Sequence, residues 1–277
     1  GARGAADMKP LAELDATPIL GVLTDIDDTL TTDGLLTGEA YDALWSLRAA
    51  GLLLVGVTGR PAGWGEVLAR QWPVEGIVTE NGAVTVYREG TSVHRVESCP
   101  EGERRSRRAR LAQLVETVRE KVPEARMSDD VELRRSDVTW DIGERMKLPD
   151  DRVASIVAEI VRAGARWTRS SVHLHATFDG ADKASGVVAF LCDRLAEDAG
   201  RALARWAFVG DSGNDAACFA AFDTTIGVAN VRASLASLPV GPRFVTTAER
   251  GAGFAELAAT LAGLRAQRQS SATHRTS

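Results

Sequence analysis

The sequence predicts an α/β protein whose core is a doubly wound, Rossmann-like parallel sheet, interrupted by an inserted α+β cap domain. Two stretches, residues 19–79 and 182–228, alternate short apolar runs with amphipathic segments, which is the order of strands and helices in such a sheet. Between them the pattern changes to short alternating strands and longer helices. The chain has 277 residues, more than the roughly 100–200 of one typical domain, so it can hold both parts.

The first stretch begins with a nearly continuous aliphatic run, residues 19–26, which is typical of a strand buried on both sheet faces. Apolar residues at helical spacing follow, and Gly51 ends that helix as a C-terminal glycine. A second buried strand comes next. The elements expected here are strands at residues 19–26, 52–57 and 76–79 and helices at residues 38–50 and 64–71.

The alternation is interrupted from residue 84 to residue 178 and then resumes. We therefore expect a discontinuous core, residues 1–83 and 179–277, and a cap of residues 84–178. The cap elements expected are strands at residues 84–87, 93–96, 137–142 and 172–176 and helices at residues 107–122 and 151–163. The core elements expected after it are helices at residues 182–199 and 214–221 and strands at residues 206–209 and 224–228.

Charge and cysteine usage exclude several classes of protein. The formal net charge of -5 argues against binding nucleic acid through the overall field of the protein. The three cysteines form no CxxC pair, so neither a disulfide framework nor a thiolate zinc site is indicated. The first ten residues lack the apolar run of a signal peptide, and no window is apolar enough to span a membrane. We expect a cytoplasmic protein without nucleic-acid or membrane partners, a monomer or a weak homodimer.

An arginine cluster begins the first cap helix, and acidic residues precede it. Its members are Arg104, Arg105, Arg107, Arg108 and Arg110, after Glu97, Glu101 and Glu103. Because the charges are mixed and the total is acidic, this pattern favours a solvated helix face over a nucleic-acid surface.

Residues that carry chemistry collect where the predicted core strands end, which is where open parallel sheets bind their ligands. They are Asp25, Asp27 and Asp28 after the first strand, Thr58, Gly59 and Arg60 after the second, Lys183 at the start of the helix after the insertion, and Asp211, Asn214 and Asp215 after the strand at residues 206–209. Several carboxylates at one mouth repel one another unless a hard cation neutralises them. Mg²⁺ prefers carboxylates together with phosphate oxygens and water, so the sequence predicts a Mg²⁺ site that shares a phosphorylated ligand.

Asp25 and Asp27 lie two residues apart, so they can serve one substrate as nucleophile and proton donor. The alternative is that each acidic loop is a solvated turn, and the segment 210–215 could be a turn rich in Asx residues. The presence of Thr58 and Lys183 in the expected order favours a site.

These segments resemble the four ordered motifs of the haloacid dehalogenase (HAD) superfamily, specifically its phosphatases with a large α+β cap inserted after the third core strand (class IIB, Cof-like or sucrose-phosphatase-like). The matching segments are residues 25–31 (DIDDTLT), 57–60 (VTGR), Lys183 and 210–215 (GDSGND). Residues 80–83 (ENGA) are also similar to this cap class, and the resemblance covers residues 19–264. Asp28 replaces a glycine common in the superfamily, and we interpret it as a turn-compatible residue.

The resemblance implies that Asp25 attacks phosphorus and becomes an aspartyl phosphate. It also implies that Asp27 protonates the leaving alcohol and then activates the hydrolytic water. In this superfamily an acid at the position of Asp27 marks phosphate chemistry, which disfavours a dehalogenase.

By the same resemblance, Thr58 and the Gly59 amide hold phosphate oxygens, and Lys183 anchors both the phosphate and the nucleophile. Arg60 and Asn214, in the same motifs, are candidates for binding the substrate. The resemblance assigns Mg²⁺ to Asp25, the carbonyl of Asp27, Asp211 and, through water, Asp215.

A cap of this size closes over the core site and favours small substrates. The cap residues that we select as substrate-binding candidates are Arg135, Trp140, Glu144 and Arg145. Guanidinium groups bind hydroxyls and carboxylates, and an indole stacks on a sugar ring. The alternatives are that the arginines are surface residues and that Trp140, between Val138 and Ile142, is a core residue.

His173 and His175 alternate on a predicted strand and so share one face. Because no third metal ligand is evident, the pair favours a polar sheet face over a metal site.

The expected function is a Mg²⁺-dependent phosphomonoesterase acting on a small phosphorylated metabolite, with a sugar phosphate as first candidate. An alternative within the enzyme class is a phosphatase of a phosphorylated cofactor or nucleotide, such as flavin mononucleotide, pyridoxal phosphate or a pyrimidine phosphate. An alternative of another class is a non-catalytic sugar-phosphate sensor, which the intact acid/base residue Asp27 disfavours.

Overall fold

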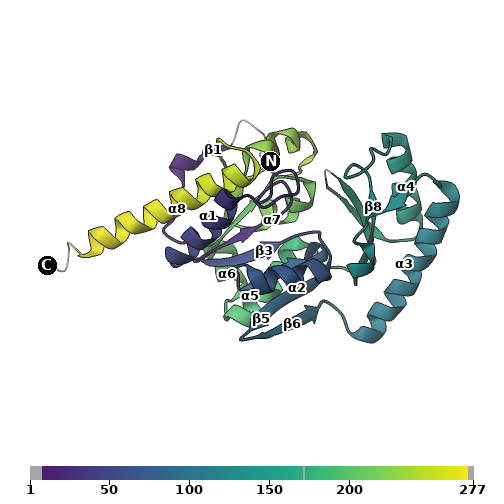
Figure 1. Cartoon of the computed structure of the whole chain (residues 1–277), viewed down its shortest axis with the longest axis horizontal. Helices are drawn as coiled ribbons and strands as arrows, with labels where there is room; N and C mark the ends of the chain where they lie inside the picture. Colours follow the sequence, from purple (N-terminus) through teal and green to yellow (C-terminus); the bar gives the residue numbers. More distant parts are fainter. Residues whose placement is uncertain (1–7, 171, 274–277) are drawn as a thin grey trace.

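The chain folds into a large sheet and a separate smaller sheet, each covered by helices (Figure 1). The computed structural model describes residues 8–170 and 172–273. The strands of the large sheet are β1 (Lys9–Pro10), β2 (Gly21–Thr24), β3 (Leu53–Val57), β4 (Gly76–Thr79), β5 (Val84–Glu89), β6 (Ser92–Glu97), β11 (Trp206–Gly210), β12 (Thr224–Gly227) and β13 (Phe244–Val245). The predicted α/β class is confirmed.

The strand order of the large sheet is β1-β13-β12-β11-β2-β3-β4-β5-β6. The chain runs from β2 outward through β3 and β4, and later returns to place β11 on the other side of β2. All pairings from β1 to β4 in this order are parallel. The direction of winding therefore reverses between β2 and β11, and a ligand crevice is expected beyond their carboxyl ends.

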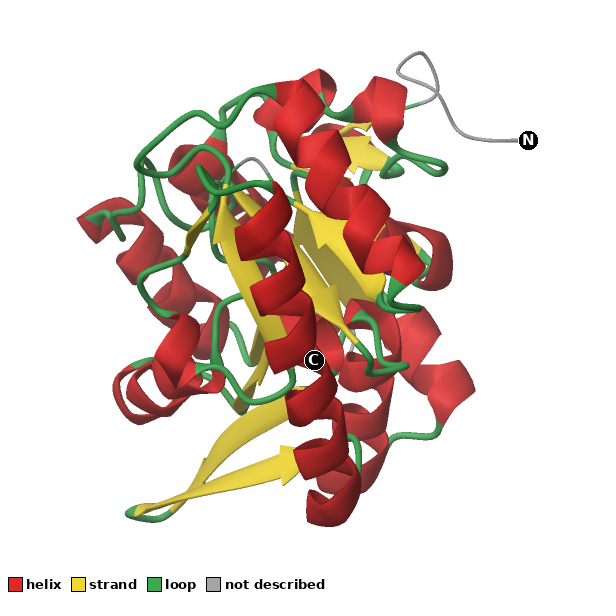
Figure 2. Ribbon diagram, turned by 90° about the vertical axis from the view of Figure 1, so that its right-hand side faces the viewer, coloured by secondary structure: helices red, strands yellow, loops and turns green. Residues whose placement is uncertain are grey.

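Helices cover both faces of the large sheet, which lies between them in Figure 2. One face packs against α1 (Gly38–Ala49), α2 (Ala62–Gln71) and α8 (Arg250–Thr273), and the other against α5 (Lys183–Leu195), α6 (Ala199–Arg205) and α7 (Ala216–Ala221). Successive residues of β2 serve opposite faces: Val22 packs with the first group of helices and Leu23 with the second. This explains why β2 reads as a continuous apolar run.

The hairpin of β5 and β6 belongs to the large sheet, which corrects the expectation that residues 84–97 are part of the insertion. β5 pairs antiparallel with β4, and β6 pairs antiparallel with β5. Val84 and Val86 of β5 are buried in the core beneath α2. An alternating pattern fits an antiparallel edge of a parallel sheet as well as it fits a separate domain, so the pattern alone assigned this hairpin wrongly.

The insertion contains a four-stranded antiparallel sheet in the order β7-β8-β10-β9. Its strands are β7 (Arg126–Met127), β8 (Asp137–Asp141), β9 (Arg166–Arg169) and β10 (His173–Thr177), and its helices are α3 (Glu101–Lys121) and α4 (Asp150–Arg162). Leucines and valines of α3 and valines and isoleucines of α4 pack on one sheet face around Trp140 and Leu174. The other face carries polar side chains, among them Thr139, His173 and His175.

The arginine cluster lies in α3 and is less solvated than expected. Arg104 is buried and pairs with Glu97, and Arg107 binds Asp179 at 2.7 Å. These residues attach α3 to the hairpin and to the segment that leaves the insertion.

Within residues 8–170 and 172–273, no helix combines the length and apolar character needed to cross a membrane.

Candidate active site

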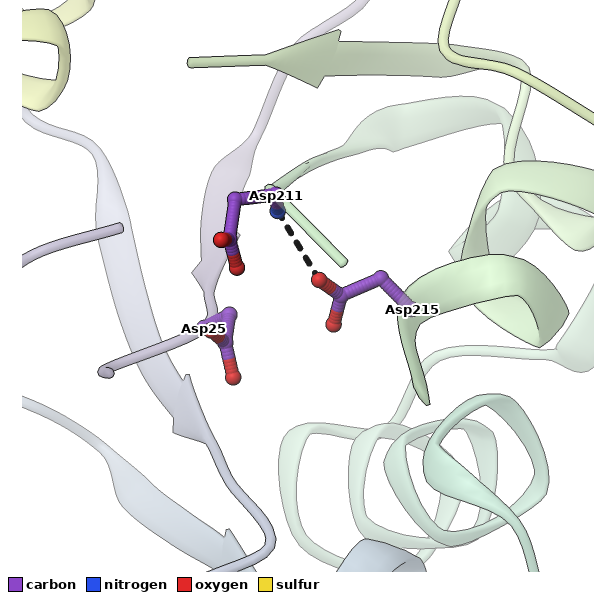
Figure 3. A group of neighbouring side chains, drawn as sticks. All are labelled: Asp25, Asp211 and Asp215. Carbon is purple, nitrogen blue, oxygen red and sulfur yellow. Dashed lines mark hydrogen bonds between the residues drawn. The ribbon is translucent and has the colours of Figure 1, made fainter. Parts of the chain in front are cut away.

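Three buried aspartates meet at the carboxyl ends of β2 and β11 (Figure 3). Asp25 directly follows β2, and its amide donates to the carbonyl of Val209 in β11 at 2.9 Å. Asp211 follows β11, and Asp215 lies one turn further on. Ligand oxygens of the three carboxylates lie within 4.8 Å of one another. The convergence predicted from separate sequence segments is therefore present.

Lys183 joins two of these aspartates. Its ammonium lies 2.6 Å from Asp25 Oδ1 and 2.7 Å from Asp215 Oδ1, and its side chain is fully buried. Lys183 is the first residue of α5, where Asp182 forms a capping box with Ser185. Burial lowers the pKa of Lys183, but the two carboxylates outweigh burial and raise this pKa above its ordinary value.

The loop after β11 orients its acids by backbone hydrogen bonds. Asp215 Oδ2 accepts from the amides of Asp211 at 2.9 Å and Ser212 at 3.0 Å. The Asn230 amide donates to Asp211 Oδ2 at 3.0 Å. Each carboxylate thus keeps one defined orientation, with oxygens turned toward Asp25.

The electrostatics of the cluster fit a divalent cation. Burial raises the pKa of Asp25, and nearby Asp215 and Asp211 add to this effect against Lys183, which lowers it. Burial, followed by the charges of Asp215 and Asp28, raises the pKa of Asp211 to about 7. Carboxylates with raised pKa values at such spacing are the donor set that a hard cation stabilises.

The loop after β3 supplies Gly59, which lines the cavity described below, and the buried Thr58 next to it. The Thr58 amide donates to Val78 of β4 at 2.8 Å, and its hydroxyl accepts from the Arg60 amide at 3.0 Å. Arg134 of the insertion donates to the Gly59 carbonyl at 2.8 Å. This loop is therefore held by both the core and the insertion.

Arg60 links Asp27 to the insertion. Its Nε lies 3.0 Å and 3.1 Å from the two oxygens of Asp27, and its Nη2 lies 2.9 Å from Asp27 Oδ1. The same guanidinium contacts Glu144 Oε1 at 3.1 Å and Asp130 Oδ2 at 3.5 Å. It also stacks on Trp64, with its carbon 4.7 Å from the ring centroid. The motif arginine is thus shared between a core acid and cap acids.

A cavity of about 20 Å³ lies between these groups and the polar face of the cap sheet. Its lining residues are Asp25, Asp27, Gly59, Arg60, Ser170, Val172, His173, His175, Asp211, Ser212 and Asn214. A single water needs roughly 10–15 Å³ by this kind of measure, so the structure shows the cap closed over the core.

None of the four cap residues predicted to bind substrate lines this cavity, but Glu144 lies next to it and contacts two lining residues, Arg60 and His173. Trp140 is 2% exposed in the hydrophobic core of the insertion, on the sheet face away from the site. Arg135 reaches Glu97 at the hairpin, and Arg145 pairs with exposed Asp129. The predictions for Trp140, Arg135 and Arg145 are corrected.

His173 and His175 line the cavity, which their sequence pattern did not predict. They do lie on a polar sheet face, as expected, but that face forms the roof of the cavity. Their alternation already predicted a shared face, whereas the side toward which the face turns depends on how the insertion packs on the core. Arg134 and Asp130 were likewise not selected, and both are buried at this junction.

No protein-family model matches this sequence, and a search of curated proteins also finds no match. Solved structures do match. A Thermoplasma acidophilum protein aligns with a TM-score of 0.69 at 20% identity, over 88% of this chain and 98% of that one. A phosphatase of the haloalkanoate (HAD) enzyme superfamily from Bacteroides thetaiotaomicron aligns with a TM-score of 0.61 at 18% identity, over 89% and 96%.

Sucrose-phosphatase from Synechocystis, solved with sucrose and phosphate, aligns with a TM-score of 0.57 at 16% identity, over 87% of this chain and 97% of that one. These likenesses extend over the core and the insertion alike. The chain has the fold of the capped HAD phosphatases, as its motifs led us to expect.

Proposed function

We propose that this chain is a Mg²⁺-dependent phosphomonoesterase that hydrolyses a small sugar phosphate through an aspartyl phosphate on Asp25. The observation that carries the proposal is the buried Lys183 ammonium, bound to Asp25 and Asp215 beyond the ends of β2 and β11. A purely structural ion pair needs neither Asp27 nor Gly59 at the cavity beside it. The fold shared with a sucrose-phosphatase supports a sugar phosphate as substrate.

In the proposed first step, an Asp25 oxygen attacks phosphorus, and the bond between phosphorus and the ester oxygen breaks. The Asp27 carboxyl gives its proton to the departing alkoxide, so a neutral alcohol leaves. In the second step, Asp27 removes a proton from water as that water attacks the phosphorus of the aspartyl phosphate. Inorganic phosphate leaves, and both aspartates return to their starting states.

Other residues bind and orient the phosphoryl group. The Thr58 hydroxyl and the Gly59 amide would donate to its oxygens, and Lys183 would neutralise charge next to Asp25. Asp25, Asp211 and Asp215 would hold Mg²⁺, with the Asp27 carbonyl as a further ligand. The bound cation would screen the repulsion between the nucleophile and the phosphoryl oxygens.

Asp27 has to be released before it can act. In the closed arrangement Arg60 occupies both carboxylate oxygens of Asp27, so an ester oxygen reaches Asp27 only after this contact breaks. Arg60 has acceptors in Glu144 and Asp130, which can keep it paired when it leaves Asp27. Substrate binding would thus couple the position of the cap to the freedom of the acid.

The test is hydrolysis of p-nitrophenyl phosphate with and without Mg²⁺, by the wild type, Asp25→Asn and a control, Asp42→Asn. Asp42 is exposed on α1, so its amide variant should behave as wild type. We expect Mg²⁺-dependent turnover that Asp25→Asn abolishes without lowering the melting temperature. Tight binding of phosphate esters with no turnover by the wild type would instead favour a sensor.

A further inference from the structure

Gly59 lies next to two side chains that come from different parts of the fold. A Cβ placed on Gly59 would lie 3.2 Å from Asn81 Oδ1, 3.3 Å from Asn81 Nδ2 and 3.4 Å from His175 Nε2. Asn81 belongs to the turn after β4, and His175 belongs to β10 of the insertion. Asn81 Oδ1 and His175 Nε2 therefore both lie close to Gly59, at the proposed phosphate loop.

His175 turns its Nε2 toward Gly59. Its Nδ1 lies 3.0 Å from Asp137 Oδ2 and 2.9 Å from Thr139 Oγ1. A carboxylate only accepts, so Nδ1 carries the proton and Nε2 carries the lone pair. Burial, with a smaller effect from Arg134, lowers the pKa of His175 to about 4, and the ring is therefore neutral near pH 7. His175 is 3% exposed and lines the cavity.

Asn81 adds a second acceptor without a donor. Its backbone is left-handed, with φ of 53°, which turns the side chain toward the insertion. Its Nδ2 donates to Thr168 Oγ1 of β9 at 3.4 Å. Its Oδ1 is buried and has no hydrogen-bond partner within residues 8–170 and 172–273. An unpaired buried acceptor is costly, so the site is completed by a ligand that brings a donor.

We propose that Asn81 Oδ1 and His175 Nε2 accept hydrogen bonds from two neighbouring hydroxyls of the leaving group, next to the phosphoester. Because both atoms accept hydrogen bonds, they favour a substrate that presents hydroxyl donors there. They disfavour a substrate that presents a carboxylate or a second phosphate, which only accept. The substrate class is then a polyol or sugar phosphate with adjacent free hydroxyls. This inference rests on the proposed function and deepens it by assigning substrate selection to these two residues, with Asp137 as the positioning residue of His175.

The experiment compares glycerol 3-phosphate, which keeps two neighbouring hydroxyls, with n-propyl phosphate, which has none. Both release a primary alcohol, so both depend on protonation by Asp27. We expect wild-type kcat/KM to be about 10- to 100-fold higher for glycerol 3-phosphate. His175→Phe should remove most of this preference, because it should lower kcat/KM more for glycerol 3-phosphate than for propyl phosphate. His175→Gln, which keeps an acceptor oxygen, should restore part of it.

Melting temperatures of both variants report whether they fold. Equal hydrolysis of the two esters by the wild type would overturn the inference alone, as would equal losses for both esters in His175→Phe. Failure of the wild type to hydrolyse p-nitrophenyl phosphate with Mg²⁺ would overturn the proposed function and the inference together.

Discussion

Lys183 and Asp27 have different roles in the proposed site, because Lys183 is buried and Asp27 is partly exposed. Lys183 has no exposed side-chain surface and two carboxylate partners. The side chain of Asp27 is 34% exposed and has a contact that can be exchanged. A fixed cation suits a nucleophile that attacks in one direction, and a mobile acid suits successive contact with an alcohol and a water.

Asp27→Asn should lower kcat most for esters of poorly acidic alcohols, because an alkoxide leaves slowly without a proton. The p-nitrophenolate ion leaves without this help, so its formation should be affected less. Steady-state kinetics with alkyl and aryl phosphates measure the difference. Equal losses for both kinds of ester would argue against Asp27 as the proton donor.

His175 should make stability depend on pH. Folding keeps its imidazole neutral, whereas the unfolded chain binds a proton near pH 6.5, so stability is full above that pH and falls as the pH drops toward about 4. The loss from this group is on the order of 3 kcal/mol across that interval. The groups facing it are Asp137, Thr139, Arg134 and His173.

Urea unfolding between pH 7 and pH 4.5 measures this effect, with His175→Gln as the comparison. The variant should show a shallower decline than the wild type over this interval. Identical slopes would mean that His175 is protonated when folded.

At the scale of elements, the closest backbone approach at the site is between α5 and the turn at residues 80–82. A Cβ on Gly186 would lie 2.4 Å from the Gly82 Cα, and Gly82 has a φ of +105°. This contact sets the position of the α5 N-terminus and hence that of Lys183. Gly82 and Gly186 therefore support the site, although neither is proposed to contact the substrate.

Gly186→Ala should destabilise the protein by about 1–3 kcal/mol through overpacking and reduce turnover by displacing Lys183. Gly263→Ala is the matched control, because Gly263 also lies in a helix and a Cβ there meets nothing within 4 Å. The control should stabilise by about 0.5–1 kcal/mol. Urea unfolding and p-nitrophenyl phosphate turnover measure both effects. Equal behaviour of the two variants would contradict this packing argument.

The sequence predicted best those elements that belong to the parallel part of the sheet, where the alternation of strands and helices determines which strands are adjacent. The strand at residues 76–79 was predicted with the bounds of β4, and the acids after β2 and β11 met as expected. The short β1 and β13 and the helices α6 and α8 were not predicted. β1 and β13 have two residues each, too few for a periodic pattern to show.

The predictions for cap residues such as Trp140 were wrong for a different physical reason. Period-two alternation separates Trp140 from Thr139 in β8 and places His175 beside Thr139, but it does not say which face meets the core. Helices α3 and α4 cover the Trp140 face, and only their packing leaves the histidine face for the site. The sequence therefore favoured Trp140, whose indole is suited to stacking on a sugar, over His173 and His175, which line the cavity.

The insertion is closed over the core in this structure, so we expect the insertion to move before the proposed substrate can enter. On one side of the junction, buried Glu80 accepts from the amides of Ala62, Arg135 and Ser136. On the other side, the ion pairs of Arg60 reach Asp27 and Glu144, whose side chains are 34% and 37% exposed. Because water can reach these two carboxylates but not Glu80, which is 3% exposed, the Arg60 side should open first.

Hydrogen exchange with and without Mg²⁺ and orthovanadate, a phosphate mimic, measures this opening. We expect the amides of residues 143–145 to become protected on binding, while those of Arg135 and Ser136 stay protected in both states. Uniform changes across the junction would contradict opening at the Arg60 side.

Rapid-quench labelling tests most directly whether Asp25 accepts the phosphoryl group. A radiolabelled phosphate ester is mixed with enzyme and Mg²⁺, quenched in acid within the first turnover, and digested for peptide mapping. We predict a single acid-stable, hydroxylamine-sensitive label on the peptide that contains Asp25, absent from Asp25→Asn and longer-lived in Asp27→Asn. Turnover by the wild type with no label in any of these quenches, or a label on another residue, would contradict the account.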